Sequence, residues 1–252
     1  MQTASKKVIN GWAMYDWANS VYNLVITSTI FPAYYESITG DGNDATTNDP
    51  VVLFGRTYAN TALYNYALAI AFTVVAIILP LLTSIADFKG NKKKFLFFFC
   101  TMGSLSCGSL FFFKSSAELP LGLMLLILAC IGFWSSYVFS NSYLPEIAAP
   151  EDMDKVSARG FSMGYTGSVI LQLVCFVFIF KPEWFGMEND KTLPARVSFL
   201  LVGIWWWGFA QYSLSCLPNG VPSGVTNTKN VITNGYSELK KVWNQLAELP
   251  VL

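Results

Sequence analysis

The stretch GWAMYDWANSVYNLVITSTIFPAYYE, residues 11–36, carries a carboxylate and several amides inside a segment that is otherwise apolar. From Trp17 to Tyr35 it holds 19 residues without a charge. At about 1.5 Å per residue, a helix of this length is long enough to cross a hydrocarbon core of about 30 Å. The stretch therefore predicts a membrane-spanning helix that contains polar side chains.

The polar side chains of this segment share one side of the predicted helix. At about 100° per residue, five of them fall within an arc of about 100°. They are Asp16, Asn19, Ser20, Asn23 and Thr27. Amides turned toward lipid would be unpaired, so we expect the stripe to face protein or a water-filled pathway. The alternative for Asp16 is a carboxylate near the membrane surface, stabilised by the dipole at a helix N-terminus.

The whole chain has the composition of a membrane protein. Of its 252 residues, 53% are hydrophobic and 13% are charged, against about 25% charged in soluble domains. Six uncharged runs are each long enough to span a bilayer as a helix, whereas barrel strands would be about half as long and alternating. The runs cover residues 17–35, 57–86, 95–113, 119–145, 160–180 and 197–228. The predicted fold is an all-α, six-helix transmembrane bundle.

We divide the chain into two regions on this pattern. Residues 1–217 are the expected bundle, and 218–252 are a cytoplasmic linker with an amphipathic helix over 236–249. The expected spans are about 12–36, 60–86, 95–113, 120–143, 160–180 and 197–217.

The basic residues predict the orientation of the bundle. If the N-terminus is cytoplasmic, eleven of the 16 lysines and arginines fall on the cytoplasmic side. These are Lys6, Lys7, Lys89, Lys92, Lys93, Lys94, Lys155, Arg159, Lys229, Lys240 and Lys241. The others are Arg56, Lys114, Lys181, Lys191 and Arg196. Because basic residues concentrate in cytoplasmic loops, we expect both termini in the cytoplasm of a multi-pass protein, in a bacterial inner membrane.

Histidine and cysteine usage argues against several kinds of chemistry. The chain has no histidine, which removes His-based catalysis, His proton relays and the common zinc sites. All five cysteines lie inside expected spans, where they are typical of small packing residues and not of disulfides or metal ligands. We expect no enzymatic activity, cofactor, metal or nucleic-acid partner. The expected partners are the lipid bilayer and a small-molecule solute.

Later spans supply further candidates for the pathway. Asn65 belongs to a polar start of the second span. Tyr165 and Gln172 share a face of the fifth, and an amide at mid-membrane requires a partner or a cavity. Tyr137 and Asn141 lie on a different face of the fourth span from its small residues and are weaker candidates.

The loop TSIADFKGNKKK, residues 83–94, joins two long helices by a tight turn. Gly90 permits the sharp turn, Lys92 begins the cationic run, and Asp87 can meet a neighbouring helix end or a cation. We expect a cytoplasmic gate here. A plain positive-inside loop explains the lysines, but it does not predict the Asp-x-x-Gly spacing.

A second basic residue lies near the same end of the bundle. Arg159 is either a positive-inside anchor or an ion-pair partner of Glu146 or Asp87, and we slightly favour the ion pair.

The 83–94 loop resembles the major facilitator superfamily, whose second and third helices are joined by Gly-x-Leu-Ala-Asp-Arg-x-Gly-Arg-Lys. The matching residues are Ala86, Asp87, Gly90 and Lys92. The departures are Thr83, Phe88 and Asn91, with Ile85 a mild replacement of Leu. In that family the loop is a latch between two halves, and the missing arginine changes its detail.

Three further motifs narrow the resemblance. They are GWAxYDWANS (11–20), LPEIA (144–148) and DKVSARGFxxGYxG (154–167). They are similar to the "unknown major facilitator" family, relatives of the yeast autophagy-linked vacuolar amino-acid effluxer. The resemblance implies a secondary active transporter that moves a small solute, with amino acids as candidates, by alternating access. It also implies the N-terminal six-helix half of a major-facilitator fold, built as an inverted 3+3 repeat.

The resemblance leaves a second half unaccounted for. We expect a truncated record of a protein of about twice this length, with a six-span chain that pairs with a second copy as the alternative. A different functional hypothesis is a membrane scaffold or receptor that binds cytoplasmic partners through the helix at 236–249.

Overall fold

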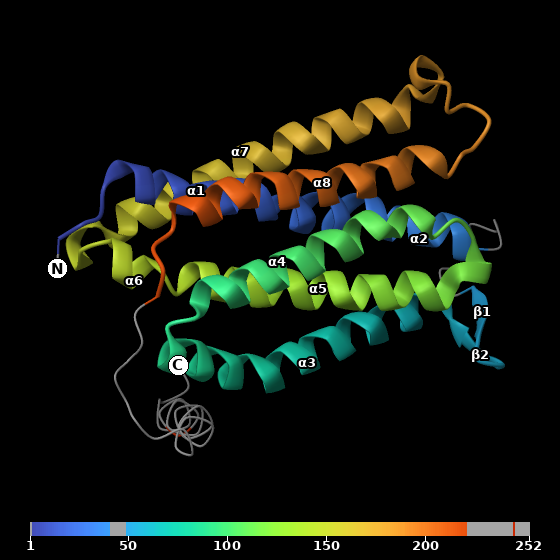
Figure 1. Cartoon of the computed structure of the whole chain (residues 1–252). Helices are drawn as coiled ribbons and strands as arrows, with labels where there is room; N and C mark the ends of the chain where they lie inside the picture. Colours follow the sequence, from blue (N-terminus) through green and yellow to red (C-terminus); the bar gives the residue numbers. More distant parts are fainter. Residues whose placement is uncertain (1, 41–48, 221–243, 245–252) are drawn as a thin grey trace, which may run out of the picture.

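The computed structural model describes residues 2–40, 49–220 and 244, and arranges them as long helices that run roughly antiparallel (Figure 1). The long helices are α3 (Asn60–Lys89), α4 (Lys92–Ser109), α5 (Leu119–Asn141), α7 (Met153–Phe180) and α8 (Leu193–Cys216). The short α6 covers Leu144–Ile147, and single 3-10 turns cover Leu110–Phe112, Ser116–Glu118, Pro150–Asp152 and Pro182–Phe185. The predicted helix at 236–249 lies outside the described residues apart from 244.

Within the described residues, five helical stretches are long and apolar enough to cross a membrane. They are Asn60–Thr83, Lys92–Phe112, Ser116–Ile147, Pro150–Phe180 and Leu193–Cys216. These stretches overlap the second to sixth expected spans, which confirms an all-α membrane architecture.

The first expected span is helical, but its hydrogen-bonding pattern changes twice. It consists of α1 (Lys6–Val21), the π-helix η1 (Tyr22–Ile30) and α2 (Phe31–Thr39). In η1 the Ser28 hydroxyl donates to the Asn23 carbonyl (2.9 Å), five residues earlier. The π-helix ends just before Pro32, which has no N–H to continue either ladder. This segment is not among the five stretches above.

A β-hairpin follows at one end of the bundle, between the first segment and α3. Its strands β1 (Pro50–Leu53) and β2 (Arg56–Ala59) are antiparallel, and Leu53 pairs with Arg56. The tight turn uses positive φ at Phe54 (50°) and Gly55 (75°).

Small residues allow the central helices to approach closely. A Cβ on Gly132 of α5 would lie 2.4 Å from the Gly103 Cα of α4, and one on Gly203 of α8 would lie 2.6 Å from the Ser104 carbonyl oxygen. Such contact between backbones is the usual way in which membrane helices gain packing energy. All five cysteines are free and buried in this packing, as expected.

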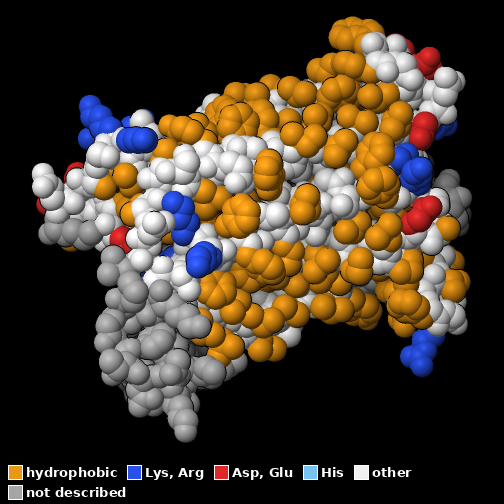
Figure 2. Space-filling model, in the orientation of Figure 1, with side chains coloured by type: hydrophobic (Ala, Val, Ile, Leu, Met, Phe, Trp, Pro, Cys, Tyr) orange, Lys and Arg blue, Asp and Glu red, His pale blue; other side chains and the backbone are white. Residues whose placement is uncertain are grey.

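The surface has an apolar belt between two charged ends. Figure 2 shows hydrophobic side chains across the middle of the helices, with blue and red side chains gathered near both ends. Lys6, Lys92 and Met153 begin α1, α4 and α7 at the end where the N-terminus lies (Figure 1). Lys181 and Lys191 lie in the connection between α7 and α8 at the opposite end.

Candidate functional site

A cavity of about 320 Å³, lined by both polar and aromatic side chains, lies where the first helical segment meets α5 and α7. It brings together three of the predicted pathway residues, Ser20, Asn23 and Tyr165. The remaining lining residues are Leu24, Ser28, Phe133, Trp134, Tyr137, Phe161 and Ser168.

Glycines of α7 set its distance from α1 beside this cavity. A Cβ on Gly160 would lie 2.4 Å from the Asp16 Oδ2 atom, and one on Gly164 would lie 2.5 Å from the Ser20 Oγ atom. A Cβ on Gly167 would lie 2.9 Å from Trp17. The α7 backbone therefore lies directly against the side of α1 that carries the predicted polar stripe.

Asp16 is buried in this contact, with 6% of its surface exposed. Within the described part of the chain, no hydrogen bond or ion pair reaches its carboxylate. Because α1 begins at Lys6, Asp16 is well beyond the first turn, where the helix-dipole alternative would place it. A buried carboxylate without a partner is costly, and such groups in membrane helices usually have a functional role.

Asn19 is fully buried, but it is not part of the cavity wall. Among the described residues, neither atom of its side-chain amide has a hydrogen-bond partner. The same holds for the hydroxyls of Tyr15 and Tyr22 and for the indole N–H of Trp206. The Tyr22 and Trp206 rings are 5.7 Å apart, centroid to centroid. Asn19 is thus associated with the core of the bundle rather than with this cavity.

Gln172 links α7 to the π-helix away from the cavity. Its Oε1 atom accepts a hydrogen bond from the Thr29 hydroxyl (2.8 Å), while its buried Nε2 atom has no partner in the described part of the chain. Asn65 is exposed on α3 and is not among the cavity-lining residues, so the structure does not bring it to the other candidates.

The cavity also contains residues that the sequence interpretation underrated. Tyr137 was a weaker candidate, and Trp134 was not a candidate at all, yet both line the cavity. Residues at i and i+3 share a helix face, and this spacing of two aromatic residues with polar atoms was the available signal. The small residues that drew attention instead serve packing, since Gly132 contacts Gly103 of α4.

The residues predicted to form the cytoplasmic gate lie at the end of the bundle where α1 begins. Gly90 ends α3 with φ 64°, as expected for the residue that makes the turn. The ammonium group of Lys92 contacts a Glu146 carboxylate oxygen at 2.6 Å, which joins α4 to α6. Lys93 donates to the Leu217 carbonyl (2.9 Å), so the same turn also holds the end of α8.

The predicted pairing of Arg159 with Glu146 is not formed. Glu146 pairs with Lys92, which begins the neighbouring helix, whereas Arg159 is exposed on α7. Asp87 lies in the last turn of α3, and its side chain is outside the described set. Among the described residues, no group of three or more carboxylate or thiol side chains is placed to hold a metal ion.

Comparison with known proteins gives the family. Residues 4–153 and 149–252 match the family described as "Vacuole effluxer Atg22 like". The chain belongs to this family. Its relatives include an uncharacterized MFS-type transporter, YxiO, of Bacillus subtilis, which is 32% identical over 78% of this chain and 43% of the relative. Autophagy-related protein 22-2 of Neosartorya fischeri is 23% identical over 91% of this chain and 52% of the relative.

These comparisons make the Atg22-like chain a multi-pass membrane protein of a transporter family, related to the major facilitator superfamily. A further relative, autophagy-related protein 22-2 of Aspergillus niger, is 26% identical over 68% of this chain and 38% of the relative. The chain spans about half the length of the curated relatives that it matches. No solved structure matches it.

Proposed function

We propose that this Atg22-like chain forms one half of a secondary active transporter, which moves a small solute across the membrane by alternating access. The observation that carries this proposal is a cavity lined by serine, asparagine and tyrosine side chains, beside the buried carboxylate of Asp16 and between α5 and α7, which are long enough to span a bilayer. Ser20, Asn23 and Tyr165 line the proposed pathway, and Asp16 is the group that responds to the coupling ion or to the solute.

The cavity has an incomplete wall, which supports closure by a second half or a second copy. Tyr165 is 72% exposed although it lines the cavity, and Asn23 is also exposed. Transporters of this kind place the solute between two repeats near the middle of the bilayer. In the proposed assembly, Asn65 and Gln172 contribute to the same half of the pathway from α3 and α7, and the six spans form an inverted repeat of three and three.

The end that carries Lys92 is the proposed cytoplasmic gate, with both termini in the cytoplasm. The contact between Lys92 and Glu146 supports this assignment because it ties the α3–α4 turn to the α5–α7 connection. Asp87, Gly90 and Arg159 complete the gate at the same end of the helices. The higher identity to the Bacillus subtilis relative than to the fungal ones supports a bacterial cytoplasmic membrane.

The first solutes to test are amino acids, which the resemblance of the sequence motifs implies. Efflux is the direction to test first, in line with the family description. A protein made from the complete coding sequence, reconstituted in liposomes, is expected to give saturable flux of a labelled amino acid mixture. Asp16→Asn keeps the shape of the side chain, removes its charge and should lower that flux at least tenfold. Asp154→Asn changes an exposed carboxylate at the start of α7 and serves as the control.

Two results would contradict the proposal. Lack of saturable flux for every small solute tested would overturn the transport function, and flux by Asp16→Asn equal to that of Asp154→Asn would remove Asp16 from the mechanism.

A further inference from the structure

Aromatic rings form half of the wall of the cavity of about 320 Å³. Five of its ten lining residues are aromatic, three of them on α5 and two on α7. They are Phe133, Trp134, Tyr137, Phe161 and Tyr165. The face of an aromatic ring carries partial negative charge. The cavity therefore offers a ligand ring faces as well as hydroxyl and amide groups.

The three rings of α5 form a corner. Phe133 and Tyr137 are one turn apart and nearly parallel, with an interplanar angle of 8° and centroids 6.1 Å apart. Trp134 stands almost perpendicular to both rings, at 80° to Phe133 and 88° to Tyr137. Phe161 and Tyr165 border the same space from α7. Rings that face one space from different directions are the arrangement of the aromatic cages that bind ammonium groups.

Two serine hydroxyls of the wall present hydrogen-bond acceptors to the cavity. The Ser28 hydroxyl donates its proton to the Asn23 carbonyl (2.9 Å), and the Ser168 hydroxyl donates to the Gly164 carbonyl (2.8 Å). A hydroxyl has one proton and two lone pairs, so only lone pairs remain for a ligand once the proton is donated. These two positions therefore match a ligand that donates hydrogen bonds.

The charge closest to the cavity is negative. Among the described residues that line it, none is a lysine or an arginine. The buried carboxylate of Asp16 is one turn before Ser20 of the cavity wall, about 6 Å along the helix axis. Arg159 is exposed on α7 and about 200° around that helix from Phe161, so it faces away from the cavity. A cation in the cavity is attracted by Asp16 through apolar surroundings, which screen charge poorly.

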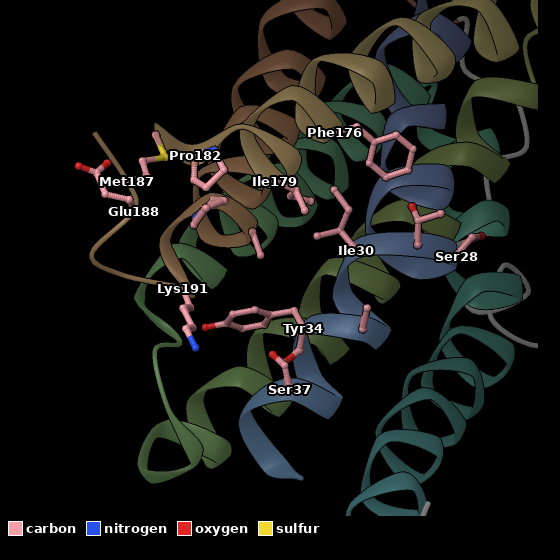
Figure 3. Close-up of a pocket in the computed structure, with 14 residues that line it drawn as sticks. Ser28, Ile30, Tyr34, Ser37, Phe176, Ile179, Pro182, Met187, Glu188 and Lys191 are labelled. Carbon is pink, nitrogen blue, oxygen red and sulfur yellow. The ribbon is translucent and has the colours of Figure 1, made fainter. Parts of the chain in front are cut away.

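A larger cavity, of about 650 Å³, has a different charge. It lies at the end of the bundle opposite the N-terminus, between α2 and the connection from α7 to α8, and Ser28 belongs to its wall as well (Figure 3). In Figure 3 the Lys191 side chain extends toward Tyr34 and Ser37, while Glu188 points away from the cavity at its outer rim. The Lys191 charge disfavours a cation there, so the two cavities differ in the ligands that they favour.

We propose that the cavity of about 320 Å³ binds the ammonium group of an organic cation, with the Trp134, Tyr137 and Tyr165 rings around that group and Asp16 as its counter-charge. This inference rests on the proposed transport function, because it names the class of solute that the pathway accepts. A neutral solute of the same shape fills the space equally well but lacks the attraction of the ring faces and of the carboxylate. Amino acids carry an ammonium group, but the inference does not require that they are the solute.

The test is equilibrium binding of radiolabelled choline to protein made from the complete coding sequence, purified in a mild detergent. The competitors are unlabelled choline and dimethylbutanol, the neutral alcohol in which a carbon atom replaces the charged nitrogen of choline. We expect saturable choline binding. Dimethylbutanol should displace choline about tenfold less effectively than unlabelled choline does, because it has the same shape without the charge.

Variants of the wall place the bound cation. Trp134→Leu should weaken choline binding about tenfold, and Trp134→Phe, which keeps a ring, should weaken it less. Asp16→Asn should also weaken it about tenfold, with Asp154→Asn unchanged. The control for loss of a ring is Phe178→Leu on α7. The Phe178 ring packs on Phe185 (4.4 Å between centroids) and lines neither cavity, so this variant should bind choline as wild type does.

Two results would overturn the proposal. Equal displacement by choline and dimethylbutanol would mean that the cavity holds apolar solutes whatever their charge. Saturable flux of another solute in a protein that does not bind choline would contradict the cation site and leave the transport function intact.

The opposite combination separates the two proposals. Choline binding that Trp134→Leu weakens and Phe178→Leu does not, in a protein without flux of any solute, would support the cation site and contradict transport. Equal weakening by these two variants would overturn the site, because it would mean a general loss of structure and not loss of a contact.

Discussion

The first helical segment and α7 are tightly packed at one end and separated at the other. At the end where α1 begins, glycines of α7 such as Gly160 let its backbone contact the Asp16 and Ser20 side chains. At the other end, Phe176 and Ile179 stand opposite Ile30 and enclose the cavity of about 650 Å³. The size of the side chains along one helix pair thus decides where it is closed and where it has space for a ligand.

The largest loss of stability is expected from a bulky side chain placed where α7 packs tightly against α1. Gly160→Leu would place a side chain where even a Cβ lies 2.4 Å from the Asp16 carboxylate. Overpacking of this kind typically costs about 1–3 kcal/mol, and a contact this short should be at the upper end. Thermal unfolding in detergent measures the loss. Gly208→Leu on α8 is the control, because a Cβ there meets nothing within 4 Å, and an equal loss in that variant would contradict the packing argument.

A smaller loss of stability is expected from removal of the hydrogen bond that joins η1 to α7 near the open end. Thr29→Val removes the hydroxyl that bonds to Gln172 Oε1 and leaves a buried oxygen unpaired, which should cost about 1–2 kcal/mol. Gln172→Leu removes that oxygen together with the unpartnered Nε2 atom and should cost less. Unfolding curves of the two variants test this order. A larger loss for Gln172→Leu would mean that Nε2 has a partner in the assembled protein.

The smallest change in stability is expected from loss of the ion pair between Lys92 and Glu146, at the end of the bundle where α1 begins. Lys92→Gln breaks the contact with Glu146, whose side chain is 41% exposed. Pairs that water can reach contribute about 0–1 kcal/mol, so the unfolding temperature should change little. Under the proposed gate, the distribution between inward- and outward-open states should change instead, as measured by distances between spin labels. Lys181→Gln is the control. Identical spin-label distances in the two variants would mean that the contact between Lys92 and Glu146 has no role in gating.

The long spans could be predicted from the sequence because they depend on local composition. Uncharged length alone located the five apolar helical stretches. Gly90 was identified because a sharp turn between two helices needs a left-handed residue. The separation of basic residues to two ends follows from the same alternation of long spans and short loops.

The residues that line the site could not be predicted from local sequence, because they depend on how each helix is rotated against its neighbours. Tyr137 lines the cavity of about 320 Å³ because the small face of α5 is used for packing on α4. Asn19 lies in the bundle core although it belongs to the same arc as Asp16 and Asn23 in a projection of an ideal helix. Glu146 pairs with Lys92 because α6 turns the chain toward α4, and no local pattern indicates that turn.

The π-helix has a consequence for how the length of the first span can change. Between Tyr22 and Ile30 the chain has more residues per turn than an α-helix, since its hydrogen bonds reach one residue further. Deleting one residue there can be absorbed by conversion of wide turns to α-helical ones, which leaves Asp16 and Tyr34 on their present sides. The same deletion within α1 would rotate everything beyond it by about 100°. The first span can therefore lose one residue in η1 without a change in the orientation of the residues on either side of it.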